Sequence, residues 1–245
     1  MYVGRILLVL MTLSARACAL ILAMGLIVTS QGPTLAGATD GQEPATGILT
    51  GVVRLTAGKA PSPASAYDGR SVGPRPKALA ESANVVVFFE GLRGSGGLKA
   101  TAAAIVQKDE QFVPHVVAVT AGSVVEFPNQ DPFFHNVFSL SKPATFDLGR
   151  FPPGSSRART FSRPGLVKVY CEIHSHMSAV ARVFDHPWFT IPDRAGAFRI
   201  EGVPVGEHAV VAWHERIGER RDRVTIRPGA TTTITFTLPV LEPAP

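Results

Sequence analysis

Charged residues and cysteines are scarce in this 245-residue sequence, in which Asp, Glu, Lys and Arg make up 18% and cysteine occurs twice. So low a charge content excludes a coiled coil, and 45% hydrophobic residues exclude a disordered chain. The net charge of +5 is scattered without a basic run, so we expect no nucleic-acid partner. The 23 glycines and 20 prolines instead favour strands joined by turns, and we predict an all-β protein.

The first 38 residues have the pattern of a secretory signal peptide. Arg5 and Arg16 precede the apolar run 17–28, and residues 36–38 supply the small side chains that a signal peptidase recognises. Because the apolar run is short for a bilayer, we expect cleavage after Ala38, no stable membrane insertion after it, and a periplasmic protein. A retained membrane anchor is the alternative.

Cleavage would leave Cys171 as a lone thiol in a compartment where thiols are normally paired. Taken alone it could be a small buried hydrophobe, but His174 and Met177 follow it at C-x2-H-x2-M spacing. Alternation in the flanking runs puts Cys171 and Met177 on the inward faces of two neighbouring strands. His174 then lies in the loop between them, so a thiol, an imidazole and a thioether are expected to converge on one point.

A fourth ligand is expected from another strand, and His135 in the segment 127–137 is the candidate. Its neighbour Asn136 is expected to hydrogen-bond to the ligand loop and hold the two segments together. Two histidines and a cysteine thiolate with a weak axial methionine are the ligands of a blue-copper electron-transfer site. The same four side chains could also close a zinc tetrahedron, so zinc stays open.

Three other histidines are interpreted as lying outside the ligand set. We expect His115 to be structural and His176 to be exposed on the ligand loop. The cluster Trp213-His214-Glu215 is expected to be a strand end packed against the metal-binding region.

Three segments carry a family pattern: F-x-P-x5-T-x-G-x2-V-x-F over 112–127, H-N-V over 135–137, and P-G-x4-Y-C-x2-H-x2-M over 164–177. In this order they resemble the plastocyanin-like pattern of the cupredoxins, and the short ligand loop is similar to that of amicyanin. The resemblance implies a Greek-key β-sandwich with one type 1 copper ion. It makes His135, Cys171 and His174 the equatorial ligands and Met177 the axial one.

A second family pattern follows the copper region. D-x2-G-x-F over 193–198 and G-x-P-x-G over 202–206 resemble the second half of a carboxypeptidase regulatory-like domain, a small prealbumin-like sandwich. Strand patterns at 47–55 and 83–91, which resemble the first half of that domain, lie before the copper region.

The economical interpretation is an insertion. We predict a cupredoxin domain at 99–186, inserted into a second sandwich whose two parts are 46–98 and 187–240. Each part alone has too few strands to bury a core.

Enzyme fingerprints such as G-x-S-x-G, H-E-x-x-H, Walker and Rossmann motifs do not occur in the sequence. One four-ligand site also leaves no second copper for oxidase or reductase chemistry. We therefore expect an electron carrier with a redox partner protein in the periplasm, and not an enzyme. Two alternatives stay open: a copper storage or delivery protein, and a binding module in which copper is incidental.

Overall fold

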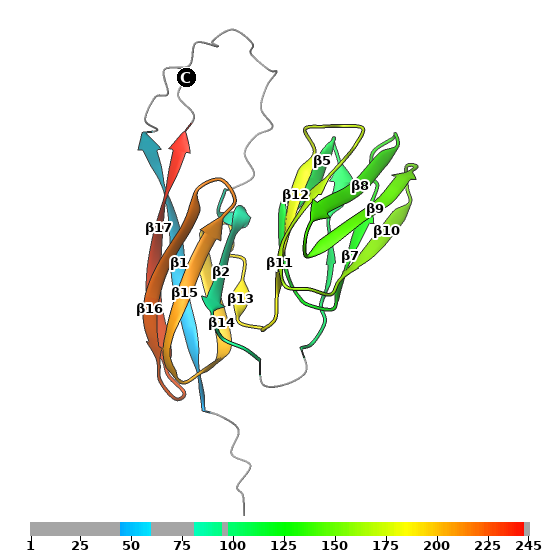
Figure 1. Cartoon of the computed structure of the whole chain (residues 1–245). Coiled ribbons are helices and arrows are strands. Elements are labelled where there is room, and N and C mark those ends of the chain that lie inside the picture. Colours follow the sequence, from blue (N-terminus) through cyan, green and yellow to red (C-terminus); the bar gives the residue numbers. More distant parts are fainter. Residues whose placement is uncertain (1–44, 60–80, 95–97, 243–245) are drawn as a thin grey trace, which may run out of the picture. The chain divides into compact units, whose positions relative to one another are not determined.

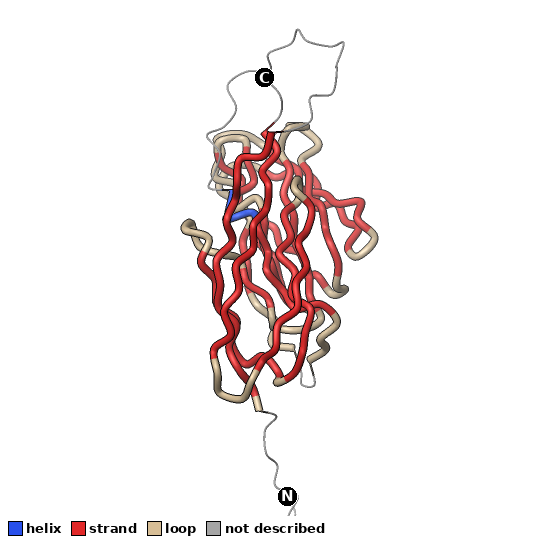
Figure 2. The backbone as a smooth tube through the Cα atoms, turned by 90° about the vertical axis from the view of Figure 1, so that its left-hand side faces the viewer, coloured by secondary structure: helices blue, strands red, loops and turns tan. Residues whose placement is uncertain are grey.

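The computed structural model describes residues 45–59, 81–94 and 98–242 and shows an all-β chain, as predicted (Figure 1). Strands run through most of these residues, and a single 3-10 turn, Glu81–Asn84, is the one helical element among them (Figure 2). No helix in this part of the chain is long and apolar enough to cross a membrane. The expected signal segment, 1–38, lies outside the described residues.

Two sheets combine strands from the early and late parts of the chain. A three-stranded sheet has the order β14-β1-β17, and a four-stranded sheet has the order β13-β2-β15-β16. Their strands are β1 (Thr46–Lys59), β2 (Val85–Glu90), β13 (Phe189–Thr190), β14 (Ala197–Pro204), β15 (Gly206–His214), β16 (Gly218–Ile226) and β17 (Thr231–Glu242).

Strand β1 is central in its sheet, antiparallel to β14 and parallel to β17. The first strand described therefore lies between two strands from the late part of the chain. It extends past the predicted end at Leu55 because its parallel pairing with β17 continues to Lys59. Strand β2 likewise lies between β13 and β15. Pairing of early with late strands is what an inserted domain requires. The domain boundaries stay a prediction.

The D-x2-G-x-F motif has a physical cause in the turn before β14. Asp193 Oδ1 accepts hydrogen bonds from the backbone amides of Ala195 and Ala197. Gly196 has φ +82°, and a Cβ added there would lie 2.2 Å from the carbonyl oxygen of Val53. Only glycine allows β1 and this turn to approach so closely.

The middle of the chain forms three more sheets, ordered β10-β7-β3, β6-β12-β11-β8-β9 and β4-β5. Their strands are β3 (Ala102–Ala104), β4 (Val106–Lys108), β5 (Gln111–Val113), β6 (Val116–Thr120), β7 (Ser123–Pro128), β8 (His135–Ser141), β9 (Ala144–Phe151), β10 (Ser156–Phe161), β11 (Gly165–Tyr170) and β12 (Ser178–Phe184). One buried cluster, formed entirely by residues of this region, is its core.

The hairpin of β11 and β12 has the inward faces that the sequence predicts. Val167, Val169 and Cys171 are buried on one side, and Met177 and Ala179 join the same core on the other. The antiparallel register pairs Tyr170 with Ser178 at the loop end of the hairpin. Cys171 and Met177 therefore lie just beyond the paired strands, at the two ends of the ligand loop.

A third buried cluster joins β2 and β15 to β6 and β12. It includes Phe88 and Trp213 from the first pair of strands, and Val116, Val180 and Phe184 from the second. Trp213 is thus packed against β6 and β12 of the middle region, as expected for that strand end.

Candidate metal centre

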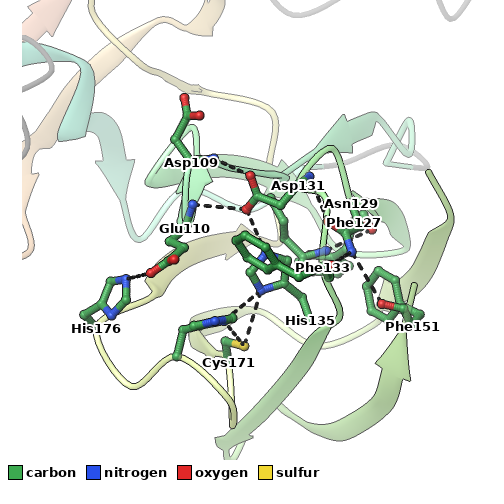
Figure 3. Close-up of polar contacts among 12 residues, drawn as sticks. Asp109, Glu110, Phe127, Asn129, Asp131, Phe133, His135, Phe151, Cys171 and His176 are labelled. Carbon is green, nitrogen blue, oxygen red and sulfur yellow. Dashed lines mark hydrogen bonds and ion pairs between the residues drawn. The ribbon is translucent and has the colours of Figure 1, made fainter. Parts of the chain in front are cut away.

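Three of the four predicted ligands meet at one end of the middle sheets. The ligand atoms of His135, Cys171 and His174 all lie within 4.8 Å of one another. Cys171 Sγ is 3.8 Å from His135 Nδ1 and 3.9 Å from His174 Nδ1, and the two Nδ1 atoms are 3.1 Å apart (Figure 3). Two imidazole nitrogens and one thiol sulfur therefore converge on one point.

The elements that carry these side chains explain the convergence. His135 is the first residue of β8, and Cys171 directly follows β11. Between β11 and β12 the chain turns back, and the Met177 amide donates to the His174 carbonyl at 3.0 Å. The Cys171 amide donates to the Met177 carbonyl at 3.4 Å, so backbone hydrogen bonds close the loop that holds His174.

Burial differs among the four predicted ligands. His135, Cys171 and Met177 are 0%, 4% and 1% exposed, whereas His174 is partly exposed. Met177 is buried in the same core cluster as Cys171. The site is therefore closed toward the interior and reaches solvent through His174.

Asn136 links the two halves of the site, as the sequence predicts. Its Oδ1 accepts a hydrogen bond of 3.3 Å from the Glu172 amide in the ligand loop. Its Nδ2 donates to Asp147 Oδ1 at 2.7 Å, which fixes the orientation of the amide. Strand β8 and the ligand loop are thereby held together next to His135 and Cys171.

Asp131 is a site residue that sequence reasoning missed. Its Oδ2 lies 2.7 Å from His135 Nε2, and the two side chains are 5% and 0% exposed. Burial raises the pKa of Asp131, but hydrogen bonds from His135 and from the Glu110 and Asp109 amides outweigh it, so this pKa lies below its ordinary value. The spacing of four residues before His135 was the available sequence signal, and it is weak outside a helix.

Aromatic packing restrains both imidazoles. The Phe133 ring lies 5.2 Å from that of His135 and 5.4 Å from that of His174, measured between ring centroids. Phe133 thus packs against both histidines, whose rings meet edge to face at an interplanar angle of 63°.

The other histidines near the region lie outside the cluster of ligand atoms. His115 Nδ1 contacts the Ser178 carbonyl at 2.9 Å, and its Nε2 contacts Glu215, which fits the structural role predicted for it. His176 is 59% exposed, and its Nε2 lies 3.3 Å from Glu110 Oε2. It is an exposed loop residue, as expected.

The chemistry of the donors fits a soft or borderline metal ion. A thiolate and a thioether favour copper or zinc over magnesium or calcium, and imidazole suits copper and zinc alike. In His135 the Nε2 atom is occupied by Asp131, so the Nδ1 atom is the one available to a metal. The cluster can hold one such ion.

The chain is similar in structure to several copper proteins. The sequence matches no protein-family model and no curated protein. A copper-containing nitrite reductase from Thermus scotoductus is 25% identical with a TM-score of 0.34, and the alignment covers 39% of this chain and 25% of that one. The chain thus spans about a quarter of the reductase.

Two smaller copper proteins are matched over nearly their whole length. A purple cupredoxin from Nitrosopumilus maritimus is 20% identical with a TM-score of 0.31, covering 34% of this chain and 99% of that one. A reduced amicyanin variant is 16% identical with a TM-score of 0.33, covering 41% of this chain and 99% of that one. The candidate metal site of this chain is inferred from the convergence of His135, Cys171 and His174.

Proposed function

We propose that this chain is an exported protein with one type 1 copper ion that transfers single electrons. The observation that carries the proposal is the convergence of two Nδ1 atoms and one thiol sulfur, all within 4.8 Å of one another. Copper bound by two imidazoles, a thiolate and a weak axial thioether supplies one-electron chemistry. His135, Cys171 and His174 are the proposed equatorial ligands, and Met177 is the proposed axial ligand.

The protein's own contribution is to hold these side chains in one arrangement. Three of the four are almost completely buried, and the loop between Cys171 and Met177 is closed by backbone hydrogen bonds. Side chains locked by packing and hydrogen bonds keep their geometry when the charge at the site changes. A rigid set of ligands suits an electron carrier. Because one four-ligand site offers no separate place for a substrate, we propose that the protein is not an enzyme.

Electrons reach the site most directly through His174, its most exposed side chain. Two large apolar side chains next to the histidines in sequence are solvent-exposed, Phe134 by 53% and Ile173 by 40%. We propose that a redox partner protein in the periplasm approaches at this face. An apolar contact excludes water and shortens the distance to the ligand.

An absorption spectrum tests the copper assignment. Copper(II) added to residues 39–245 should give an intense blue or green colour, because a thiolate donates charge strongly to copper. Cys171→Ser should remove the colour, and the matched variant Ser175→Ala in the same exposed loop should keep it. A colourless stoichiometric copper complex in the parent protein would rule out the electron-transfer proposal.

Copper storage or delivery is the second candidate, and the sulfur pair Cys171 and Met177 favours it, because thiolate and thioether are ligands of copper(I). A delivery protein should release copper(I) quickly to a chelator. An electron carrier should retain the ion through repeated oxidation and reduction, so chelator exchange during redox cycling separates the two.

A further inference from the structure

We propose that Asp131 is a positioning residue of the copper site, and that the turn Asp109–Glu110 braces it. This inference rests on the function proposed above and concerns how the site is oriented and how its reduction potential is set. It starts from the buried contact of 2.7 Å between Asp131 Oδ2 and His135 Nε2.

The contact with Asp131 decides which imidazole nitrogen of His135 would face a metal. The Asp131 carboxylate accepts hydrogen bonds only, so His135 donates its Nε2–H to it. The Nδ1 atom is then the unprotonated one, and it is the atom that faces Cys171 Sγ and His174 Nδ1. Because both partners of the hydrogen bond are buried, no water competes for it.

Two backbone amides hold the Asp131 carboxylate. Its Oδ1 accepts from the Asp109 amide at 2.6 Å, and its Oδ2 accepts from the Glu110 amide at 3.0 Å. Both amides belong to the turn between β4 and β5, where Asp109 and Glu110 have φ of 53° and 52°. Two successive non-glycine residues in the left-handed region are uncommon. Here that backbone directs both amides at one carboxylate (Figure 3).

The same turn also contacts the ligand loop. Glu110 Oε2 lies 3.3 Å from His176 Nε2, between side chains that are 46% and 59% exposed. An exposed pair of this kind contributes little stability. It nevertheless places the β4–β5 turn against both halves of the site, with His135 held through Asp131 and the ligand loop contacted through Glu110.

The charge of Asp131 acts on the basicity of His135 and on the reduction potential. A carboxylate that accepts the second N–H of a ligand histidine raises the basicity of that ligand. A more basic imidazole and a nearby negative charge both stabilise copper(II) relative to copper(I). Asp131 should therefore lower the reduction potential, while its hydrogen bond keeps the ring in the orientation that binds.

Two substitutions separate charge from orientation. Asp131→Asn removes the charge and the acceptor of the Asp109 amide but keeps one oxygen that can accept from His135, so the colour should stay and the potential should rise. Each tenfold loss of copper(II) affinity relative to copper(I) raises the potential of a one-electron couple by about 59 mV. Asp131→Ala also removes the hydrogen bond and should weaken copper(II) binding by about 10–100-fold.

Asp109→Asn is the matched control. It removes one negative charge from the neighbouring turn but keeps the backbone amide that donates to Asp131. Asparagine also tolerates the left-handed conformation. Its potential and copper(II) affinity should stay close to those of the parent. Equal potentials in the parent and Asp131→Asn, or equal shifts in Asp131→Asn and Asp109→Asn, would overturn the inference.

A metal-free measurement makes the test independent of the copper proposal. In the parent protein, nitrogen NMR should show His135 protonated at Nε2, with a slowly exchanging ring proton that Asp131→Ala loses. A ring protonated at Nδ1 would overturn the inference even if the protein binds copper. A colourless parent that still shows the Nε2 proton would contradict the proposed function and leave the positioning role of Asp131 intact.

Discussion

His115 and Glu215 form a hydrogen bond of 2.7 Å between Nε2 and Oε2, although 100 residues separate them in the chain. His115 precedes β6 and Glu215 follows β15, so the contact joins the two regions whose strands meet in the third buried cluster. Lys168 Nζ lies 3.7 Å from the other oxygen of Glu215. The hydrogen bond from His115, together with the charges of His115 and Lys168, holds the pKa of Glu215 below its ordinary value although burial raises it.

This contact predicts a pH-dependent contribution to stability. Because the folded-state pKa of Glu215 is depressed, its stabilising effect is complete above its ordinary pKa of 4.5 and disappears as the pH falls through the folded-state value. Glu215→Gln should lower the free energy of unfolding by about 1.5 kcal/mol at pH 7, a typical value for a hydrogen bond to a charged group.

Urea unfolding at several pH values measures this effect. The difference in the free energy of unfolding between the parent and Glu215→Gln should become smaller as the solution is acidified below pH 4.5. Glu201→Gln is the control, since Glu201 is 67% exposed and pairs with Arg199 at the surface. A gap that stays constant down to the acid transition would contradict the predicted linkage.

The axial and equatorial ligands should respond differently to substitution. Met177→Leu should keep the colour and raise the reduction potential, because the axial ligand tunes the potential of such a site. His135→Ala removes an equatorial ligand. It should weaken copper binding by more than about 100-fold, the largest loss usual for a residue that contacts a ligand and not the metal. Spectra and potentiometry of the two variants check this, and complete bleaching by Met177→Leu would show that the ligand ranking is wrong.

Two glycine substitutions separate backbone strain from steric clash. Gly196 and Gly202 have φ of +82° and +63°, so alanine is strained at both positions. Open space surrounds the Cβ direction of Gly202, whereas at Gly196 the Val53 carbonyl oxygen lies 2.2 Å away. Gly202→Ala should cost about 1–2 kcal/mol, the usual cost of the left-handed region.

Gly196→Ala should destabilise the fold by more, because β1 must also move away. Thermal unfolding of both variants gives the comparison. If Gly196→Ala lost no more stability than Gly202→Ala, β1 and the turn could separate without a cost in free energy.

Fragments test the predicted insertion of residues 99–186 between residues 46–98 and 187–240. Residues 187–245 alone lack β1 and β2, and so lose five core side chains that are each at most 3% exposed, namely Leu49, Val53, Val85, Val87 and Phe89. Burying such a side chain contributes about 1.5–3 kcal/mol, so their joint loss is comparable to a domain's whole margin of about 5–15 kcal/mol.

That fragment should therefore be unfolded or aggregated by circular dichroism. Residues 99–186 contain the whole core cluster of the middle sheets and should fold and bind copper alone, though less stably. A sharp thermal transition in 187–245 would instead indicate two domains in tandem.

Local pattern was enough to predict the all-β class and the ligand hairpin. Side chains of a strand alternate between two faces, so the runs beside Cys171 and Met177 already predict which of their residues are buried. The short spacing from Cys171 to Met177 also leaves His174 no place except the loop between them. His135 could be predicted because a strand-end histidine followed by an asparagine completes the set of donors.

Contacts between distant segments could be decided only by the folded chain. The meeting of Asp131 with His135 depends on the backbone of the Asp109–Glu110 turn, and nothing in a run of residues specifies which carboxylate two amides will hold. The pairing of His115 with Glu215 depends on how two sheets pack. The sequence by itself determined the all-β class and the candidate ligands, because strand periodicity and ligand chemistry are local. Only tertiary structure decided which carboxylate orients His135, because that depends on where separate segments come together in space.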